Sequence, residues 1–120
     1  MMNMPFQKLL VWQKGISLVD EIYEITKKFP KDEIWGLTSQ MRRAAVSIPS
    51  NIAEGSQRTS QKEFGNFILI AKGSLAELCT QLLIAKNRAY ISSETFDHIS
   101  EKIMEIDKML RSFFLKLGTK

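Results

Sequence analysis

The stretch FDHISEKIMEIDKMLRSFFLKL, residues 96–117, carries apolar residues at alternating intervals of three and four positions. The apolar positions are Phe96, Ile99, Ile103, Ile106, Leu110, Phe113 and Leu117. A repeat of this kind, sustained over several turns, places all of these side chains on one face of an α-helix. We therefore predict a long amphipathic helix over this stretch.

Three segments upstream show the same spacing. Their apolar positions are Val11, Gly15, Leu18, Ile22, Ile25 and Phe29 in the first, Leu37, Met41, Ala44 and Ile48 in the second, and Phe64, Ile68, Ala71, Leu75, Leu78, Leu82 and Ala85 in the third. No segment alternates with a period of two, so we predict no β-sheet. Four helices of about 22 to 28 residues with short connections predict an all-α, antiparallel up-down-up-down four-helix bundle. At 120 residues, the chain is expected to be one domain over residues 1–120.

Local signals mark where these helices begin and end. The residue before Pro30 is driven out of the α region, so the first helix should end there. Gly55 is placed to close the second helix as a left-handed C-terminal residue. Ser60 and Glu63 form a capping box for the third helix, and Ser92 can cap the fourth.

Composition excludes several classes of function. With 17 Lys and Arg against 13 Asp and Glu, the chain has a net charge of +4, which permits an acidic partner without requiring one. The single cysteine, Cys79, excludes an internal disulfide and is read as a small apolar core or interface residue. The single histidine, His98, has no second ligand at metal-binding spacing and is expected on the surface. We predict no catalytic residues, no metal and no cofactor.

Targeting and membrane signals are also weak. The N-terminal sequence lacks the basic and apolar regions of a signal peptide. The longest uninterrupted apolar runs fall far short of the ~20 residues that a membrane span requires. We therefore expect a cytoplasmic protein that does not associate with membranes.

The first helix carries a second apolar stripe beside its core stripe. This stripe consists of Trp12, Ile16, Val19 and Tyr23. It is either part of a generous core with scattered exposed residues or an interface between subunits, and its continuity favours the interface. Gly73 in the third helix would allow another helix to approach closely.

The second helix has the least generic sequence. Pro49 lies inside a helical pattern, where it removes one backbone hydrogen bond and should kink the helix. Arg43, Ser47, Ser50 and Glu54 share one face, whereas Arg42 and Arg43 diverge by ~100°. Small hydroxyls between guanidinium groups would let a phosphate backbone come close. The alternative is a solvated face with an ion pair from Glu54 to Arg43 or to Arg58.

The sequence resembles a known family over nearly its whole length. The segments that carry the resemblance are Trp12-Gln13-Lys14, Phe29-Pro30, Gly36-Leu37-Thr38, residues 40–45, residues 47–55 (SIPSNIAEG) with Arg58, and residues 70–78 (IAKGSLAEL). They are similar to proteins encoded in intervening sequences of bacterial 23S rRNA genes, also called S23 ribosomal proteins. The resemblance implies a four-helix bundle. It also implies a homopentameric ring, because the family is similar to the accessory variability protein of diversity-generating retroelements, a basic pentamer that binds nucleic acid and its reverse transcriptase.

The resemblance also directs attention to particular residues. Arg43 and Arg58 are candidate phosphate contacts, together with Arg42, Lys62 and Lys14. The motif residues Pro49, Asn51, Glu54 and Gly55 are expected to organise the kink and the turn. These motif positions could equally serve only to specify the fold.

Two functions are consistent with these observations. The first is a non-enzymatic homo-oligomer that binds RNA or other nucleic acid through a basic surface, which five copies at +4 would strengthen. The second is a scaffold that docks a partner protein and has no role with nucleic acid.

Overall fold

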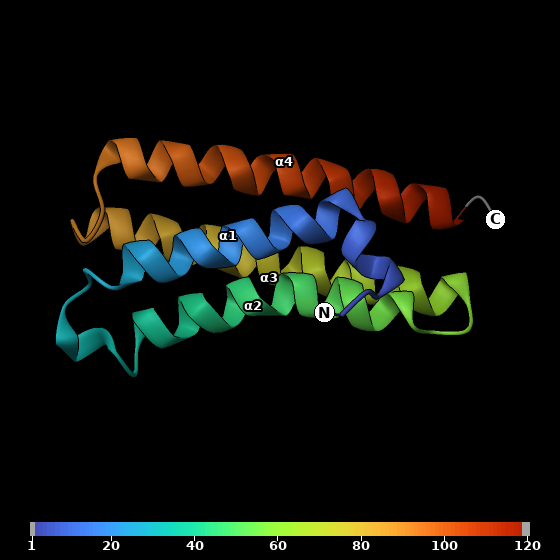
Figure 1. Ribbon diagram of the computed structural model, residues 1–120. Helices are drawn as coiled ribbons and strands as arrows, with labels where there is room; N and C mark the ends of the chain where they lie inside the picture. The colour runs from blue at the N-terminus through green and yellow to red at the C-terminus, as the bar shows by residue number, and fades with distance from the viewer. Residues whose placement is uncertain (1, 119–120) are drawn as a thin grey trace.

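The computed structural model describes residues 2–118, which form four α-helices and two short 3₁₀ helices (Figure 1). The α-helices are α1 (Leu10–Thr26), α2 (Leu37–Ser56), α3 (Gln61–Asn87) and α4 (Ser93–Gly118), and the 3₁₀ helices are η1 (Pro5–Lys8) and η2 (Lys31–Glu33). No β-strand occurs within residues 2–118. The prediction of an all-α fold built from four helices is confirmed.

The four helices lie side by side along the length of the molecule, and the chain turns back after each one (Figure 1). α2 and α3 share the most extensive contact, α3 packs on α4, and α1 packs on α2 and less extensively on α4. This ring of contacts encloses a core to which every predicted stripe contributes. Ile22, Ile48, Leu78 and Ile106 are representative members, and all are fully buried.

The first two helices are shorter than predicted. α1 has 17 residues and α2 has 20, against 27 in α3 and 26 in α4. α1 ends at Thr26, whose hydroxyl donates to the carbonyl oxygen of Ile22 (2.7 Å). Beyond it the amide of Phe29 bonds to the carbonyl oxygen of Thr26 in a tighter, three-residue turn. Phe29 is nevertheless buried. Its place in the apolar pattern therefore reflects packing in the core, although the residue lies outside the helix.

Gly55 does not end α2. The helix continues to Ser56, and within residues 2–118 no glycine has a positive φ, so the predicted left-handed residue is wrong. A Cβ atom at Gly55 would lie 2.7 Å from Cβ of Phe67 and 2.9 Å from Cδ1 of Phe64. Glycine is required because α3 approaches this turn too closely for a side chain. The left-handed conformation occurs instead at Ala89 (φ 62°), just after α3.

Pro49 is accommodated by close packing against α1. It is buried, and a Cβ atom at Gly15 would lie only 3.3 Å from its Cβ. The side-chain amide of Asn51 turns back to donate to the carbonyl oxygen (2.8 Å) and the hydroxyl oxygen (2.9 Å) of Ser47. Pro49 and Asn51 therefore both have structural contacts in the middle of a continuous α2.

The predicted helix caps are present at α3 and α4. The Ser60 hydroxyl accepts from the amide of Glu63 (3.1 Å), and the Ser92 hydroxyl accepts from the amide of Thr95 (3.1 Å). The second interaction of a capping box, in which the Glu63 carboxylate would accept from the Ser60 amide, differs from the prediction. The carboxylate accepts instead from the hydroxyls of Ser60 (3.3 Å) and Thr59 (3.5 Å). Both helix starts are nonetheless satisfied by the residues the sequence indicated.

Candidate nucleic-acid interface

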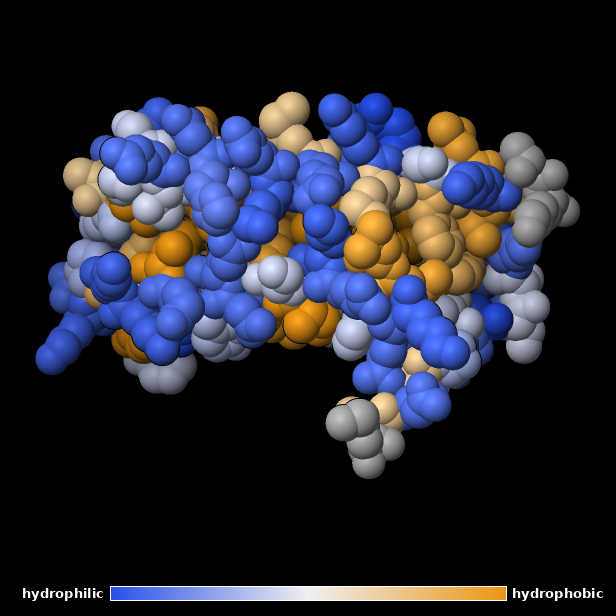
Figure 2. Space-filling model, turned by 45° about the horizontal axis from the view of Figure 1, so that its top comes forward, coloured by the Kyte–Doolittle hydropathy of each residue, from blue (hydrophilic) through white to orange (hydrophobic). Residues whose placement is uncertain are grey.

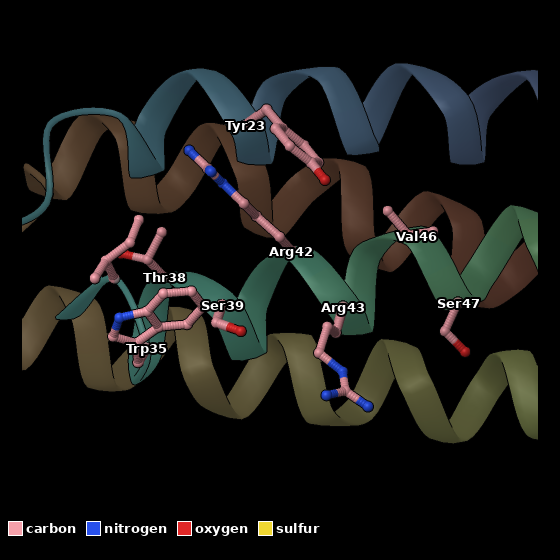
Figure 3. A pocket seen from close by; sticks show the side chains of 9 residues that line it. Tyr23, Trp35, Thr38, Ser39, Arg42, Arg43, Val46 and Ser47 are labelled. Carbon is pink, nitrogen blue, oxygen red and sulfur yellow. The ribbon is translucent and has the colours of Figure 1, made fainter.

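A groove of about 560 Å³ runs between α1 and the N-terminal half of α2 (Figure 3). It is lined by Tyr23, Ile34, Trp35, Thr38, Ser39, Arg42, Arg43, Val46 and Ser47. The lining combines two guanidinium groups, two aromatic rings and several hydroxyls, and none of these residues is acidic. Such a surface is suited to an anion that carries a flat apolar group.

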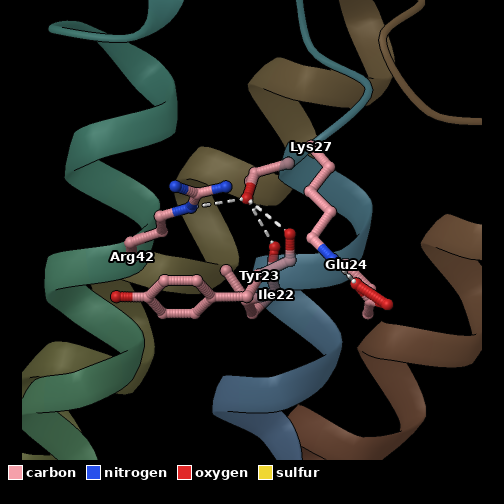
Figure 4. Close-up of polar contacts among 6 residues, drawn as sticks. Ile22, Tyr23, Glu24, Lys27 and Arg42 are labelled. Carbon is pink, nitrogen blue, oxygen red and sulfur yellow. Dashed lines mark hydrogen bonds and ion pairs between the residues drawn. The ribbon is translucent and has the colours of Figure 1, made fainter.

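Arg42 is held in a fixed position. Its Nε donates to the Thr26 hydroxyl (2.9 Å), and its guanidinium carbon lies 4.6 Å from the centre of the Tyr23 ring (Figure 4). Thr26 is itself buried and bonded to the end of α1. The two terminal nitrogens of Arg42 have no hydrogen-bond or ion-pair partner within residues 2–118. A stacked guanidinium with free donors is well suited to bind phosphate.

Arg43 projects in a different direction from Arg42. Figure 3 shows Arg42 directed toward α1 and Arg43 directed toward α3, as the predicted divergence requires. Arg43 is exposed, and no carboxylate within the described chain forms an ion pair with it. The Arg43–Glu54 pair considered from the sequence does not form. Arg43 therefore presents its full charge to solvent.

A second groove of about 520 Å³ lies between α2 and α3. The two grooves have four lining residues in common, which belong to α2 and to the connection before it: Trp35, Ser39, Arg43 and Ser47. On the α3 side it is lined by Ser74, Glu77 and Gln81. The hydroxyls of Ser47 and Ser74 lie 2.8 Å apart and join the two helices at one end of the groove.

Trp35 forms the ridge between the two grooves. Its side chain is 89% exposed, the largest value among the large apolar residues of the described chain. Sequence reasoning missed this residue because it belongs to none of the apolar stripes. That isolation was itself the available signal, since an aromatic residue outside every core stripe and beside a glycine has no evident packing role.

Glu33 anchors the connection that carries Trp35. Its carboxylate accepts from the amide of Leu37 (3.1 Å) and from the hydroxyl of Tyr90 (2.8 Å). The first of these bonds satisfies a free amide at the start of α2. Together the two hydrogen bonds lower the pKa of Glu33 below its ordinary value. Glu33 thus joins the α1–α2 connection to the α3–α4 connection.

The remaining predicted cations are dispersed. Arg58 pairs with Glu54 (2.6 Å) and stacks on Phe67, which matches the ion pair that the sequence offered as the alternative. It lies just past the end of α2, roughly 20 Å from Arg43 in the direction of the helix axis. Lys62 is exposed at the start of α3, in a groove shared with the end of α4. Lys14 pairs with Glu105 of α4 (3.2 Å), on a different side of the bundle.

The second stripe of α1 is only partly exposed. Trp12 packs against Phe6 of η1, with ring centres 5.4 Å apart, and Val19 is half-buried. Ile16 and Tyr23 are 38% and 40% exposed, although Arg42 covers one face of the Tyr23 ring. The stripe therefore presents a smaller apolar surface than the sequence suggested.

α3 exposes a larger apolar face than α1. Leu69, Ile70, Leu83 and Ile84 are each between 44% and 51% exposed. Gly73 lies among them, and a Cβ atom there would meet no atom within 4 Å, so no helix of this chain uses the predicted close approach. Cys79 is also exposed, which excludes the core position considered for it. By length and composition alone, α3 could cross a membrane, and 33% of the residues in its most apolar stretch are buried.

The rest of the surface is mostly hydrophilic on the face shown in Figure 2. There, separate apolar patches interrupt the polar side chains, and the largest lies toward the end that carries the C-terminus. The predicted surface position of His98 is confirmed, and its Nε2 lies 2.6 Å from the carboxylate of Glu21. Within residues 2–118, no group of three His, Cys, Asp or Glu side chains could hold a metal ion.

Comparison with known proteins agrees with this fold. A family model described as "23S rRNA-intervening sequence protein" matches residues 7–112. A crystal structure of a protein of unknown function from the S23 ribosomal protein family of Bacteroides thetaiotaomicron superposes with a TM-score of 0.81 and 26% identity, covering 88% of this chain and 98% of that chain. Among curated proteins, none matches the chain at a significant level.

Proposed function

The chain belongs to the 23S rRNA-intervening sequence protein family, and we propose that it is a non-enzymatic, self-associating bundle protein that binds RNA through the N-terminal half of α2. The observation that carries this proposal is the pair of arginines with free donors, Arg42 and Arg43, beside the exposed ring of Trp35. Guanidinium groups bind phosphate oxygens, and an exposed aromatic ring provides a surface for stacking.

The binding surface proposed here is smaller than the five-cation set suggested by the sequence. Arg42 and Arg43 form its centre. Lys31, in the adjoining connection, adds positive charge without an ion-pair partner within the described residues. Arg58 and Lys14 contribute less, because Glu54 and Glu105 already neutralise them.

The exposed apolar surfaces support self-association. α1 and α3 lie diagonally across the bundle: within residues 2–118 the neighbouring helices of each are α2 and α4, and α1 also packs on η1. The α1 stripe and the α3 face therefore lie on separate parts of the bundle. A contact that joins two different patches repeats around an axis and generates a ring when the rotation between copies closes. This arrangement suits the pentamer that the family resemblance implies.

RNA binding is tested by anisotropy with a labelled single-stranded RNA of about 12 nucleotides at a series of salt concentrations. We expect affinity to fall steeply with salt, because binding releases counterions. Arg43→Glu should weaken binding at least tenfold. Lys108→Glu, which changes the net charge equally at an exposed position of α4, should have little effect.

Two results would contradict the RNA proposal. One is an absence of binding at low salt by a protein that is folded by circular dichroism. The other is equal weakening by Arg43→Glu and Lys108→Glu, which would indicate attraction by net charge alone. Single-stranded DNA of the same sequence, measured in parallel, distinguishes an RNA binder from a general single-strand binder.

Self-association is tested by light scattering, with an expected mass near five times that of the 13.8 kDa chain. Ile16→Glu in α1 and Leu83→Glu in α3 should each give monomers. Mixed together, the two variants should form dimers, because each retains one intact half of the contact. A wild-type monomer that acquires mass only with a partner protein would instead support the scaffold function, with α3 as its docking face.

A further inference from the structure

We propose that the groove between α2 and α3 binds one unpaired base of the RNA, and that it selects bases that carry an exocyclic amino group. This inference rests on the proposed RNA binding and adds a ligand class to it. In this arrangement the base stacks on Trp35, its phosphate lies at Arg43, and its amino group donates to acceptors on α3.

The α2 side of the groove supplies the stacking surface and the charge. Ser39, Arg43 and Ser47 are spaced four residues apart along one edge of α2, and Trp35 lines the same groove from the connection that precedes the helix. An aromatic ring and a cation that line one groove can hold a base and its own backbone phosphate.

The α3 side of the groove supplies hydrogen-bond acceptors. Glu77 and Gln81 are four residues apart on α3 and line the same groove as Trp35 and Arg43. The Oε1 atom of Gln81 is buried and has no hydrogen-bond partner within residues 2–118. A buried acceptor without a donor costs about 1–3 kcal/mol, so a rotation of the Gln81 side chain that brings Oε1 to a donor on a ligand would be favoured.

The charges fix the orientation of the nucleotide. The carboxylate of Glu77 repels phosphate, so the backbone lies on the Arg43 side of the groove and the base edge lies on the α3 side. Cytosine, adenine and guanine place an amino group on their Watson–Crick edge, whereas uracil has a carbonyl oxygen at the corresponding position. Because that edge is free only in unpaired bases, the groove should accept single strands and not duplex.

The experiment compares labelled oligo(C) and oligo(U) of about 12 nucleotides by anisotropy, using the full chain in its native oligomeric state. Cytosine and uracil have the same size and differ at one exocyclic group. We expect oligo(C) to bind about fivefold more tightly, in line with one gained hydrogen bond. An RNA duplex of equal length should compete poorly against oligo(C).

Two variants test the assigned residues. Gln81→Met keeps the length of the side chain and removes one of the two acceptors on α3, so it should reduce the preference for oligo(C) while leaving oligo(U) binding unchanged. Trp35→Ala should weaken both oligonucleotides about fivefold or more, as expected for a lost stacking surface. Trp35→Phe leaves Trp12 as the remaining tryptophan. Because the base is proposed to stack on Trp35, RNA should quench the tryptophan fluorescence of this variant far less than that of wild type.

The outcomes separate this inference from the RNA proposal. If no RNA binds at low salt, the proposed function fails and the groove proposal fails with it. If oligo(C) and oligo(U) bind equally, or Gln81→Met retains the full preference, the groove proposal is overturned while RNA binding stands. If Trp35→Ala lowers the oligomeric mass and leaves RNA affinity unchanged, Trp35 belongs to a protein contact and the proposal is also overturned.

Discussion

The two halves of α2 use their residues in opposite ways. In the C-terminal half, Pro49 packs on Gly15, Gly55 lies against two phenylalanines of α3, and Glu54 is paired with Arg58 just beyond the end of the helix. In the N-terminal half, Arg43 is unpaired within the described chain. The C-terminal half is occupied by contacts within the chain, whereas the N-terminal half presents groups that the fold leaves available.

This contrast shows that the most distinctive stretch of sequence is not the stretch whose side chains are available to bind a ligand. Within SIPSNIAEG, Pro49 and Gly55 lie where a neighbouring helix comes close, and their requirements are steric. The residues that remain free to bind a ligand, Trp35 and Arg43, sit just upstream in less unusual sequence. Unpaired polar and aromatic groups in a groove are therefore a better guide to the binding site than the most distinctive motif.

Gly55→Ala should produce the largest change in stability. The new Cβ would lie 2.7 Å from Cβ of Phe67, an atom that cannot move without its helix. We expect a loss of about 1–3 kcal/mol in the free energy of unfolding, typical of an overpacked contact. Urea denaturation followed by circular dichroism measures it. An unchanged transition midpoint would mean that α2 and α3 can separate at this turn, and the contrast between the two halves would be lost.

Arg43, in the N-terminal half of α2, and Arg58, just beyond its C-terminal half, should differ in their effect on RNA binding. Arg43→Ala removes an unpaired charge, so we expect affinity to fall about three- to tenfold. The slope of log affinity against log salt concentration should also become shallower by roughly one, which corresponds to one lost phosphate contact. Arg58→Ala removes a charge that Glu54 already neutralises, and affinity should change less than twofold. Anisotropy titrations at three salt concentrations measure both. Equal losses for the two variants would show that the halves do not differ in function.

Most of the fold could be predicted from the sequence because the spacing of apolar residues indicates which face of each helix packs in the core. The four stripes and the caps at Ser60 and Ser92 were identified directly. The end of α1 and the role of Gly55 were not, because both depend on what a neighbouring helix does at that point. A glycine is compatible with a left-handed turn and with a close approach, and only the packing decides between them.

The candidate site was predictable only in part. Arg42 and Arg43 were identified, and their divergence follows from helix geometry. The neutralisation of Lys14 by Glu105 of α4 could not be foreseen, since 91 positions separate the two residues in the sequence. Trp35 could not be assigned a role either, because exposure depends on which side of a connection faces the solvent.

Gly73→Ala sharpens the comparison at a glycine that lies in open space. No atom of the described chain would lie within 4 Å of the new Cβ, in contrast to Gly55. Alanine is favoured over glycine inside a helix by about 1 kcal/mol, so the variant should be more stable by up to that amount. Urea denaturation measures the gain, and light scattering in parallel reports any effect on the α3 face. A destabilised variant of unchanged mass would contradict the open position of Gly73.

The smallest predicted effect concerns the anchor of the N-terminal half. Hydrogen bonds from the Leu37 amide and the Tyr90 hydroxyl lower the pKa of Glu33 in the folded state. Its contribution to stability is therefore complete above the unfolded-state pKa, about 4.3, and is lost as the pH falls through the lower folded-state value. Glu33→Gln should be slightly less stable than wild type at pH 7, and the difference should narrow as the pH is lowered below 4. Paired denaturation curves at pH 7 and at about pH 3.5 measure this change. A constant difference would mean that the charge of Glu33 does not hold Trp35 and the start of α2 in place, and that the open half of α2 is positioned by packing alone.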